Sequence, residues 1–263
     1  MKRFEGKVAI VTGSSSGIGR ATAFAFASEG AKVVIHSRAE DLADLKETEN
    51  LLVLAGVTSE NFHLVIGYIE DEKTLQQLVN DAVTRFGKID ILVNNAGVTK
   101  KVQSSPMSIE NYDFVMGINL RAPLQLTNLA LPYLKETKGC IINVSSLGAF
   151  RAMVIDQLHY CISKAGLDAF MRGCTDEFGK YGVRINNVNL GSIRTGMINN
   201  SKQFDIDTYV NTINKRVPLQ RMGTSEEAAK IIVFLASNDA SYVSGANWVV
   251  DGGLNSHSAS SEK

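Results

Sequence analysis

Short runs of apolar residues recur along this chain, and each is separated from the next by a longer segment with helical spacing. The clearest runs lie at residues 8–11, 32–35, 89–93, 139–144 and 184–189. Helix signals fill the intervals at residues 17–29, 71–86 and 226–236, and Thr224 and Glu227 have the spacing of a capping box. Strands that alternate with helices form a parallel sheet, whose right-handed crossovers place helices on both faces. The pattern predicts a doubly wound α/β fold.

Nothing in the composition marks a domain boundary. The 263 residues contain no repeat or low-complexity tract, and there are only 4 prolines. We therefore predict one domain over residues 1–254, followed by a polar, disordered tail at residues 255–263. Residues 192–217 break the alternation after a strand, which is where α/β proteins commonly cover a ligand site.

Charge and cysteine content exclude several classes of function. Lys plus Arg and Asp plus Glu both number 27, so the net charge of +0 provides no field for binding nucleic acid or an anionic membrane. The 3 cysteines have no CxxC spacing and the 4 histidines have no ligand spacing, so we expect neither a disulfide framework nor a metal site. No apolar stretch reaches the roughly 18 residues of a membrane span, and the first run is too short for a signal peptide. A cytoplasmic protein is expected.

The first apolar run leads directly into a glycine-rich turn, TGSSSGIG, and then into an alanine-rich helix. In such a turn Gly13 permits the tight bend, Gly17 lets the backbone approach a pyrophosphate, and Gly19 lets the helix pack closely. The positive end of the helix dipole favours the anion. The context predicts a Rossmann-type dinucleotide site whose pyrophosphate contacts are Gly13, Ser15, Ser16, Gly17, Ile18 and Gly19.

The residues after the second apolar run indicate which coenzyme binds. A site selective for NAD needs a carboxylate there for the ribose hydroxyls, but the sequence reads His36, Ser37, Arg38. Ser37 does not repel a 2′-phosphate, and Arg38 can pair with it. NADP(H) is therefore favoured over NAD. In the alternative interpretation, Arg38 is a solvated charge and a nearby acid, Glu40 or Asp41, holds the ribose.

Three further stretches complete a pattern with the glycine turn: NNAG at residues 94–97, Asn119, and Ser146 followed by YCISK at residues 160–164. In this order they resemble the short-chain dehydrogenase/reductase family, and the similarity extends from Gly6 to Gly253. The resemblance implies a small-molecule substrate whose carbonyl and alcohol forms are interconverted by hydride transfer with a nicotinamide. It does not indicate which substrate.

The residue types suit that chemistry. A hydride moved to a carbonyl carbon must be matched by a proton moved to its oxygen. Tyr160 can supply the proton if its pKa is shifted toward neutrality, and Lys164, four residues on along the same helix face, is placed to stabilise the phenolate. The resemblance adds that Lys164 binds the nicotinamide ribose, that Ser146 orients the substrate oxygen, and that Asn119 holds a water in a relay to Lys164. Ser145 is then only the end of its strand.

The resemblance also assigns coenzyme contacts outside the glycine turn. The end of the expected strand at residues 89–93 then lies at the adenosine ribose, where small side chains leave room, and the loop after Leu190 lies against the nicotinamide amide and the phosphates. The residues concerned are Asn94, Ala96, Gly97, Ile193 and Thr195.

This chain departs from the family pattern at two coenzyme positions. Tyr68 stands where the family commonly has an Asp that touches the adenine amine, so stacking on Tyr68 or contact with nearby acids is the alternative. Leu190 stands where a Pro usually precedes Gly191, which predicts a less rigid nicotinamide loop. Neither change removes a catalytic group.

Two other functions fit the same fold. One is a coenzyme-binding scaffold or redox sensor without turnover. The other is a reductase of 3-oxoacyl groups bound to an acidic carrier, which needs a basic surface at the pocket mouth. The cations available for such a surface are Lys100, Lys101, Arg151 and Arg194.

The resemblance implies a homodimer or homotetramer. Two expected helices, at residues 108–135 and 157–179, are richer in apolar residues than one sheet face requires, and the family pairs them across a two-fold axis. The family also forms a second interface through the strand that corresponds to residues 247–250. The apolar residues in question are Leu124, Leu126, Leu129, Leu131, Phe170 and Met171.

Overall fold

The structure, a computed structural model, describes residues 2–151, 155–196 and 206–256. Seven parallel strands form one sheet in the order β3-β2-β1-β4-β5-β6-β7. Strands β2 and β3 are added on one side of β1 and strands β4 to β7 on the other, as in a doubly wound fold. The strands are β1 Val8–Val11, β2 Lys32–Ser37, β3 Phe62–Ile66, β4 Ile91–Asn94, β5 Cys140–Ser146, β6 Arg184–Leu190 and β7 Asn247–Val250.

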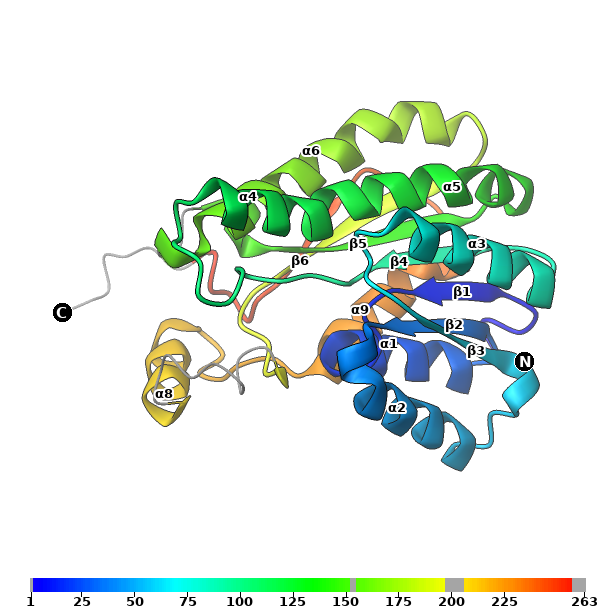
Figure 1. The fold of residues 1–263 in the computed structure, drawn as a ribbon, viewed down its shortest axis with the longest axis horizontal. Coiled ribbons are helices and arrows are strands. Elements are labelled where there is room, and N and C mark those ends of the chain that lie inside the picture. The colour runs from blue at the N-terminus through cyan, green and yellow to red at the C-terminus, as the bar shows by residue number, and fades with distance from the viewer. Residues whose placement is uncertain (1, 152–154, 197–205, 257–263) are drawn as a thin grey trace.

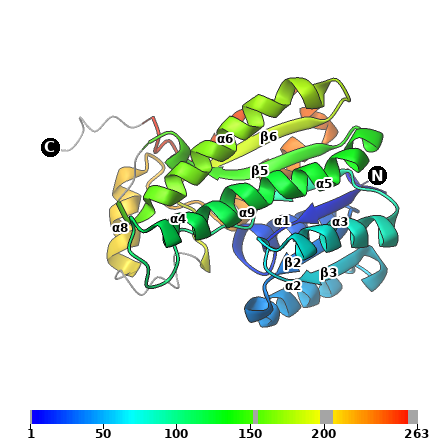
Figure 2. The ribbon, with the colours of Figure 1, turned by 45° about the horizontal axis from the view of Figure 1, so that its top comes forward.

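Helices cover both faces of the sheet (Figure 1). One layer contains α1 Gly17–Ser28, α2 Leu42–Leu54 and α9 Ser225–Ala236, and α1 packs against both of the others. The opposite layer contains α3 Glu72–Phe86, α4 Ile109–Met116, α5 Ala122–Thr137 and α6 Leu158–Gly179. Figure 2 shows α6 running beside the α4–α5 segment above the sheet. Helix α8, Ile206–Arg216, stands apart from both layers.

The core has two halves because successive strand residues point to opposite faces. In β1, Val11 belongs to the cluster under α1 and α9, whereas Ile10 belongs to the cluster under α3 and α5. In β4, Ile91 and Leu92 divide in the same way. Burial on both faces explains why the strands read as continuous apolar runs rather than alternating ones. The predicted doubly wound single domain is confirmed.

The predicted elements are present, with shifted ends. The capping box at the start of α9 is formed, with Thr224 accepting from the backbone of Glu227 and the Glu227 side chain accepting in return. Strand β3 was not among the predicted runs because it is an edge strand with exposed and half-buried positions. The single helix expected at residues 108–135 is instead interrupted between α4 and α5 by a π-helical segment, Gly117–Arg121.

Some expectations concern residues that the structure describes only in part. Of the tail expected to be disordered, residues 257–263 lie outside the described chain, and the backbone N–H groups of Asn255 and Ser256 bond to Asp251 and Gly253. Residues 197–205 of the stretch at 192–217 also lie outside it. In the described ranges, no helix combines the length and apolarity of a bilayer span, and no three His, Cys, Asp or Glu side chains gather as metal ligands would.

Candidate active site

Because the sheet is parallel, the carboxyl ends of its strands meet at one edge. The glycine turn follows β1, Asn94 ends β4, and Ser146 ends β5. Helix α6, which carries Tyr160 and Lys164, begins shortly after β5 and packs against β5 and β6. The fold thus brings the predicted phosphate turn and the predicted catalytic residues to the same edge.

The glycine turn has the backbone that its sequence predicts. Gly13 and Gly17 adopt φ values of +63° and +55°, in the left-handed region that favours glycine. A Cβ on Gly19 would lie 2.1 Å from the Gly13 carbonyl oxygen, so only glycine lets α1 pack so closely on the turn. Ser16 precedes the helix without a side-chain cap hydrogen bond, so its side chain does not satisfy the first backbone N–H groups at the positive end of the dipole.

Thr195 lies opposite this turn. A Cβ on Gly17 would be 3.5 Å from two side-chain carbons of Thr195, so the Gly17 backbone and Thr195 face each other across the helix N-terminus. Ile193 is buried and its backbone forms a bridge with Gly223, which anchors the start of this loop. An uncapped helix end facing a hydroxyl-bearing loop fits the pyrophosphate of a dinucleotide.

The structure adds a residue that sequence reasoning missed. The His36 Nδ1 accepts the Gly13 N–H at 3.1 Å, and Nε2 lies 3.1 Å from the Gly67 carbonyl, so the neutral ring with its proton on Nε2 satisfies both. Burial lowers the pKa of His36 to about 4. His36 therefore braces the phosphate turn. The available signal was a lone histidine inside a buried strand.

At the predicted adenosine end, after β2, the charged residues pair with neighbouring side chains. Arg38 donates from Nε and Nη2 to one carboxylate oxygen of Asp41, at 3.0 and 2.8 Å. Glu40 accepts from the hydroxyl of Tyr68. Both acids that the sequence left open as ribose ligands therefore have other partners in this structure. Ser37 is buried, and its hydroxyl donates to the Arg38 carbonyl at 2.9 Å.

Ser146, Tyr160 and Lys164 come together at the end of β5. The Ser146 hydroxyl accepts the Gly148 N–H at 3.1 Å and lies within hydrogen-bonding reach of the phenol. The Lys164 Nζ lies 5.7 Å from the centroid of the Tyr160 ring and donates to the Val144 carbonyl at 2.7 Å. Lys164 is thereby fixed to the strand that ends at Ser146.

Burial controls the electrostatics of this group. It raises the pKa of the Tyr160 phenol, and the Ser146 hydroxyl lowers that pKa in part. The expected shift toward neutrality is therefore wrong for this structure, because desolvation outweighs the stabilisation of the phenolate. Burial also lowers the pKa of Lys164 to about 8, while Asp168 raises it. At neutral pH the phenol carries its proton and most of Lys164 is charged.

Asn119 lies in the π-helical segment, a feature often found at functional sites. Its Oδ1 accepts the Val98 N–H at 2.8 Å, and its Nδ2 donates to the Val98 carbonyl at 2.8 Å and to the Ser163 hydroxyl at 3.0 Å. A Cβ on Gly97 would lie 3.3 Å from Asn119 Oδ1 and 3.6 Å from Lys164 Nζ. Asn119 therefore holds the loop after β4 against α6.

Asn94 and Ala96 are positioned by the interior of the sheet. The Asn94 amide donates to Asn143 at 2.9 Å, and Asn143 donates in turn to Asn187 at 2.9 Å, which gives a buried asparagine ladder across β4, β5 and β6. The Asn94 side chain thus faces this ladder, whereas the Ala96 N–H bonds to Thr12 Oγ1 at 3.0 Å beside the glycine turn.

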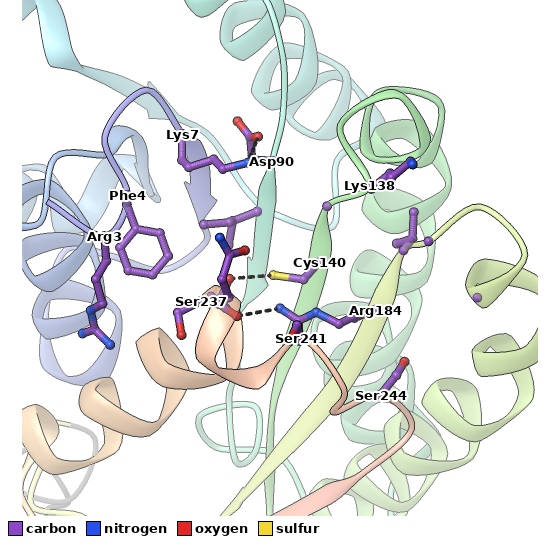
Figure 3. Close-up of a pocket in the computed structure, with 17 residues that line it drawn as sticks. Arg3, Phe4, Lys7, Asp90, Lys138, Cys140, Arg184, Ser237, Ser241 and Ser244 are labelled. Atoms are coloured by element: carbon purple, nitrogen blue, oxygen red, sulfur yellow. Dashed lines mark hydrogen bonds and ion pairs between the residues drawn. The ribbon is translucent and has the colours of Figure 1, made fainter. Parts of the chain in front are cut away.

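A separate cavity of about 330 Å³ lies at the opposite, amino edge of the sheet (Figure 3). Cys140 and Arg184, the first residues of β5 and β6, line it; the Cys140 thiol donates to the Ala236 carbonyl and Arg184 donates to the Ser237 carbonyl. None of the predicted site residues lines this cavity. The predicted chemistry and this hollow occupy different ends of the strands.

The known proteins that this chain resembles include reductases and dehydrogenases, which agrees with this geometry. Residues 13–255 match the family model described as enoyl-(acyl carrier protein) reductase. The 3-oxoacyl-(acyl-carrier-protein) reductase of Thermotoga maritima is 35% identical, with 96% of this chain and 99% of that protein covered. The L-rhamnose 1-dehydrogenase (NAD(P)(+)) of Azotobacter vinelandii is 39% identical, with 94% and 96% covered. A short-chain dehydrogenase/reductase of unknown function from Caenorhabditis elegans, solved with cofactor, superposes with a TM-score of 0.90 at 35% identity, covering 98% of each chain.

Proposed function

This chain belongs to the short-chain dehydrogenase/reductase family and is an oxidoreductase of CH–OH and C=O groups, and from that premise we propose that it is an NADPH-dependent carbonyl reductase that uses Ser146, Tyr160, Lys164 and Asn119. The convergence of the first three residues beside the phosphate turn carries the proposal. A bound nicotinamide supplies the hydride for the carbonyl carbon.

The protein residues supply the proton and the geometry. The Ser146 hydroxyl orients the carbonyl oxygen, and Tyr160 donates its proton to that oxygen as the hydride arrives. The raised pKa of Tyr160 keeps the phenol protonated at neutral pH, which is the form that carbonyl reduction requires. Lys164, largely charged at that pH, stabilises the phenolate that remains.

The preference for NADPH rests on the adenosine end. Ser37 places no charge at the position where a carboxylate would repel a 2′-phosphate, and Arg38 is 47% exposed in its side chain, within reach of solvent and ligand. In this structure the Arg38 guanidinium is paired with the Asp41 carboxylate. Because this pair is exposed, it is weak and open to exchange for a phosphate that carries nearly two charges.

A panel of ketones, aldehydes and alcohols assayed at about 340 nm with both coenzymes tests the proposal, since NAD(P)H oxidation is read directly. We expect carbonyl-dependent oxidation of NADPH that exceeds that of NADH. Tight NADPH binding with no turnover of any substrate would instead favour the scaffold or redox-sensor function.

The reductase of carrier-bound 3-oxoacyl groups remains a second candidate, supported by the relative from Thermotoga maritima. The cations expected to receive an acidic carrier are partly engaged: Lys100 pairs with Asp156 at 3.4 Å, and Lys101 pairs with Glu110 at 2.5 Å. Comparing a 3-oxoacyl thioester of a carrier protein with the same thioester of a small thiol distinguishes the two.

We also propose assembly into a homodimer or homotetramer through α5 and α6. Leu126 and Met171 do not contribute to such an interface, because both are buried in the core, which corrects the reading of them as excess apolar residues. Leu124, with Met116 and Leu120, instead lines an open groove along α4 and α5. Sedimentation at micromolar concentration tests this, and a monomer alone would refute it.

A further inference from the structure

Asp168 is a buried carboxylate that the proposed chemistry does not use. It lies four residues after Lys164 on α6 and is 2% exposed. Its Oδ1 accepts from the Ser145 hydroxyl at 2.6 Å and from Asn187 at 2.8 Å, and its Oδ2 accepts from Asn189 at 2.8 Å. Three donors converge on it, which is the environment of an ionised carboxylate.

Lys164 is a buried cation that needs an anion nearby. It is 4% exposed, and its ammonium donates to a neutral backbone carbonyl, that of Val144. A buried ammonium without a nearby anion is costly and tends to lose its proton. The ionisable groups about it are Tyr160 and Asp168, both on α6. The neighbouring β5 and the π-helical segment contribute the neutral Ser145 and Asn119, and the charged residue of that segment, Arg121, is exposed.

The donors that surround Asp168 also touch the catalytic residues. The Ser145 hydroxyl lies 3.5 Å from the Lys164 carbonyl, and the Asn189 amide donates to the Ser146 carbonyl at 3.2 Å. One buried carboxylate therefore links α6, β5 and β6 at the point where β5 delivers Ser146. Ser145, which the sequence indicated as a plain strand end, is part of this link.

We propose that Asp168 is a positioning residue: it is the buried counter-ion that keeps Lys164 charged, and through Ser145 and Asn189 it fixes Ser146 relative to Lys164. The consequence for turnover rests on the proposed function, because only a reductase that uses Lys164 needs that charge. The electrostatic relation between Asp168 and Lys164 does not depend on turnover and is tested separately.

The first experiment measures Lys164 itself. The ¹³Cε resonances of lysine are followed against pH in the full chain, with K164M to assign the signal, for wild type, D168N and the control D90N. Asp90 is a matched control because it is 3% exposed and accepts from the Val8 N–H at 2.9 Å, but it lies at the opposite edge beside the cavity of Figure 3. We expect D168N to lower the pKa of Lys164 by about one unit and D90N to leave it unchanged.

A second measurement reads the catalytic consequence. In D168N the alkaline limb of the pH profile of kcat for carbonyl reduction should move to lower pH in parallel with the NMR titration, because Lys164 loses its charge earlier. A merely structural loss would lower kcat at every pH without moving the limb. Asp168→Ser replaces D168N if the amide variant does not fold, and the same shifts are expected.

Each possible result of these two experiments either supports or overturns the proposal. An unchanged Lys164 titration in D168N, or an equal shift in D168N and D90N, overturns the proposal. A lowered Lys164 titration together with an unmoved kcat limb also overturns it, because the charge would then not serve turnover. If wild type shows no carbonyl reduction, the proposed function fails, while the NMR titration still decides whether Asp168 is the counter-ion of Lys164.

Discussion

The residues predicted to act in catalysis and those predicted to select the coenzyme are held in different ways. At the predicted catalytic end, Lys164 and Asn119 are buried and bonded to Val144 and Val98, which lie 20 and 21 residues away in sequence. Ser146 is also buried, and its hydroxyl accepts from nearby Gly148. At the adenosine end, Arg38 and Tyr68 are exposed and pair with acids on the same short stretch of surface. Buried polar groups that are fully bonded stay in one geometry, whereas exposed ion pairs exchange partners at little cost. Under the proposed function, the catalytic residues are therefore held in one arrangement, whereas coenzyme choice depends on exposed charges that can exchange partners.

The largest effect is expected from Tyr160→Phe. The variant keeps the ring and the helix face but has no proton to donate, so kcat should fall on the order of 10²- to 10⁴-fold. Coenzyme binding, measured by the quenching of protein fluorescence, should stay near wild type. Activity close to wild type in this variant would contradict the proposed mechanism.

Lys164→Met tests the second buried group. Loss of a charged hydrogen-bond donor should lower kcat roughly 10- to 100-fold and weaken coenzyme binding as well, since the ammonium serves both. The measurement is kcat and the NADPH dissociation constant together. A fall in kcat with unchanged affinity would remove Lys164 from the coenzyme site.

The double variant Ser37→Asp with Arg38→Leu exchanges the charge at the adenosine end. A 2′-phosphate loses its cation and meets a carboxylate, while the ribose diol of NAD gains an acceptor. The ratio of kcat/KM for NADPH over NADH should fall roughly 10- to 100-fold, with kcat at saturation unchanged. A wild type that already prefers NADH would show that Arg38 is a solvated charge.

Asp41→Asn sharpens the contrast on the exposed side. Releasing Arg38 from its partner should lower the KM for NADPH about two- to fivefold, the modest scale of an exposed ion pair, and should leave the KM for NADH unchanged. Asp44→Asn, a nearby charge change at the start of α2 without a bond to Arg38, is the control. Equal effects in both variants would mean that only the general surface charge had changed.

We expect the smallest effect at neutral pH from substitution of His36, whose ring bonds to the glycine turn. Its folded pKa of about 4 lies below the ordinary histidine value of 6.5, so unfolding takes up a proton between these values and the contribution to stability falls as pH drops through that range. The full loss is about 3 kcal/mol in the free energy of unfolding. Denaturant titrations at about pH 7 and 4.5 should show a smaller pH dependence in His36→Asn than in wild type. Equal dependence would mean that His36 is not neutral in the fold.

Much of the site follows from local spacing. The turn TGSSSGIG requires left-handed glycines at positions 13 and 17, and the interval of four between Tyr160 and Lys164 places both on one face of α6. Such relations depend on a few consecutive residues, so a sequence states them directly. The capping box at Thr224 is of the same kind.

The partners of those residues depend on strand register and helix packing instead. The Asn189 and Asp168 side chains meet because β6 pairs with β5 beside α6, and His36 reaches Gly13 because β2 pairs with β1. The raised pKa of Tyr160 has the same origin, since desolvation depends on everything packed around the phenol. Spacing along the chain by itself determined which groups we propose for catalysis and for the phosphate. Tertiary structure alone decided which of them are buried, which are paired and which remain free to meet a ligand, because burial and pairing arise between segments that only the folded sheet brings together.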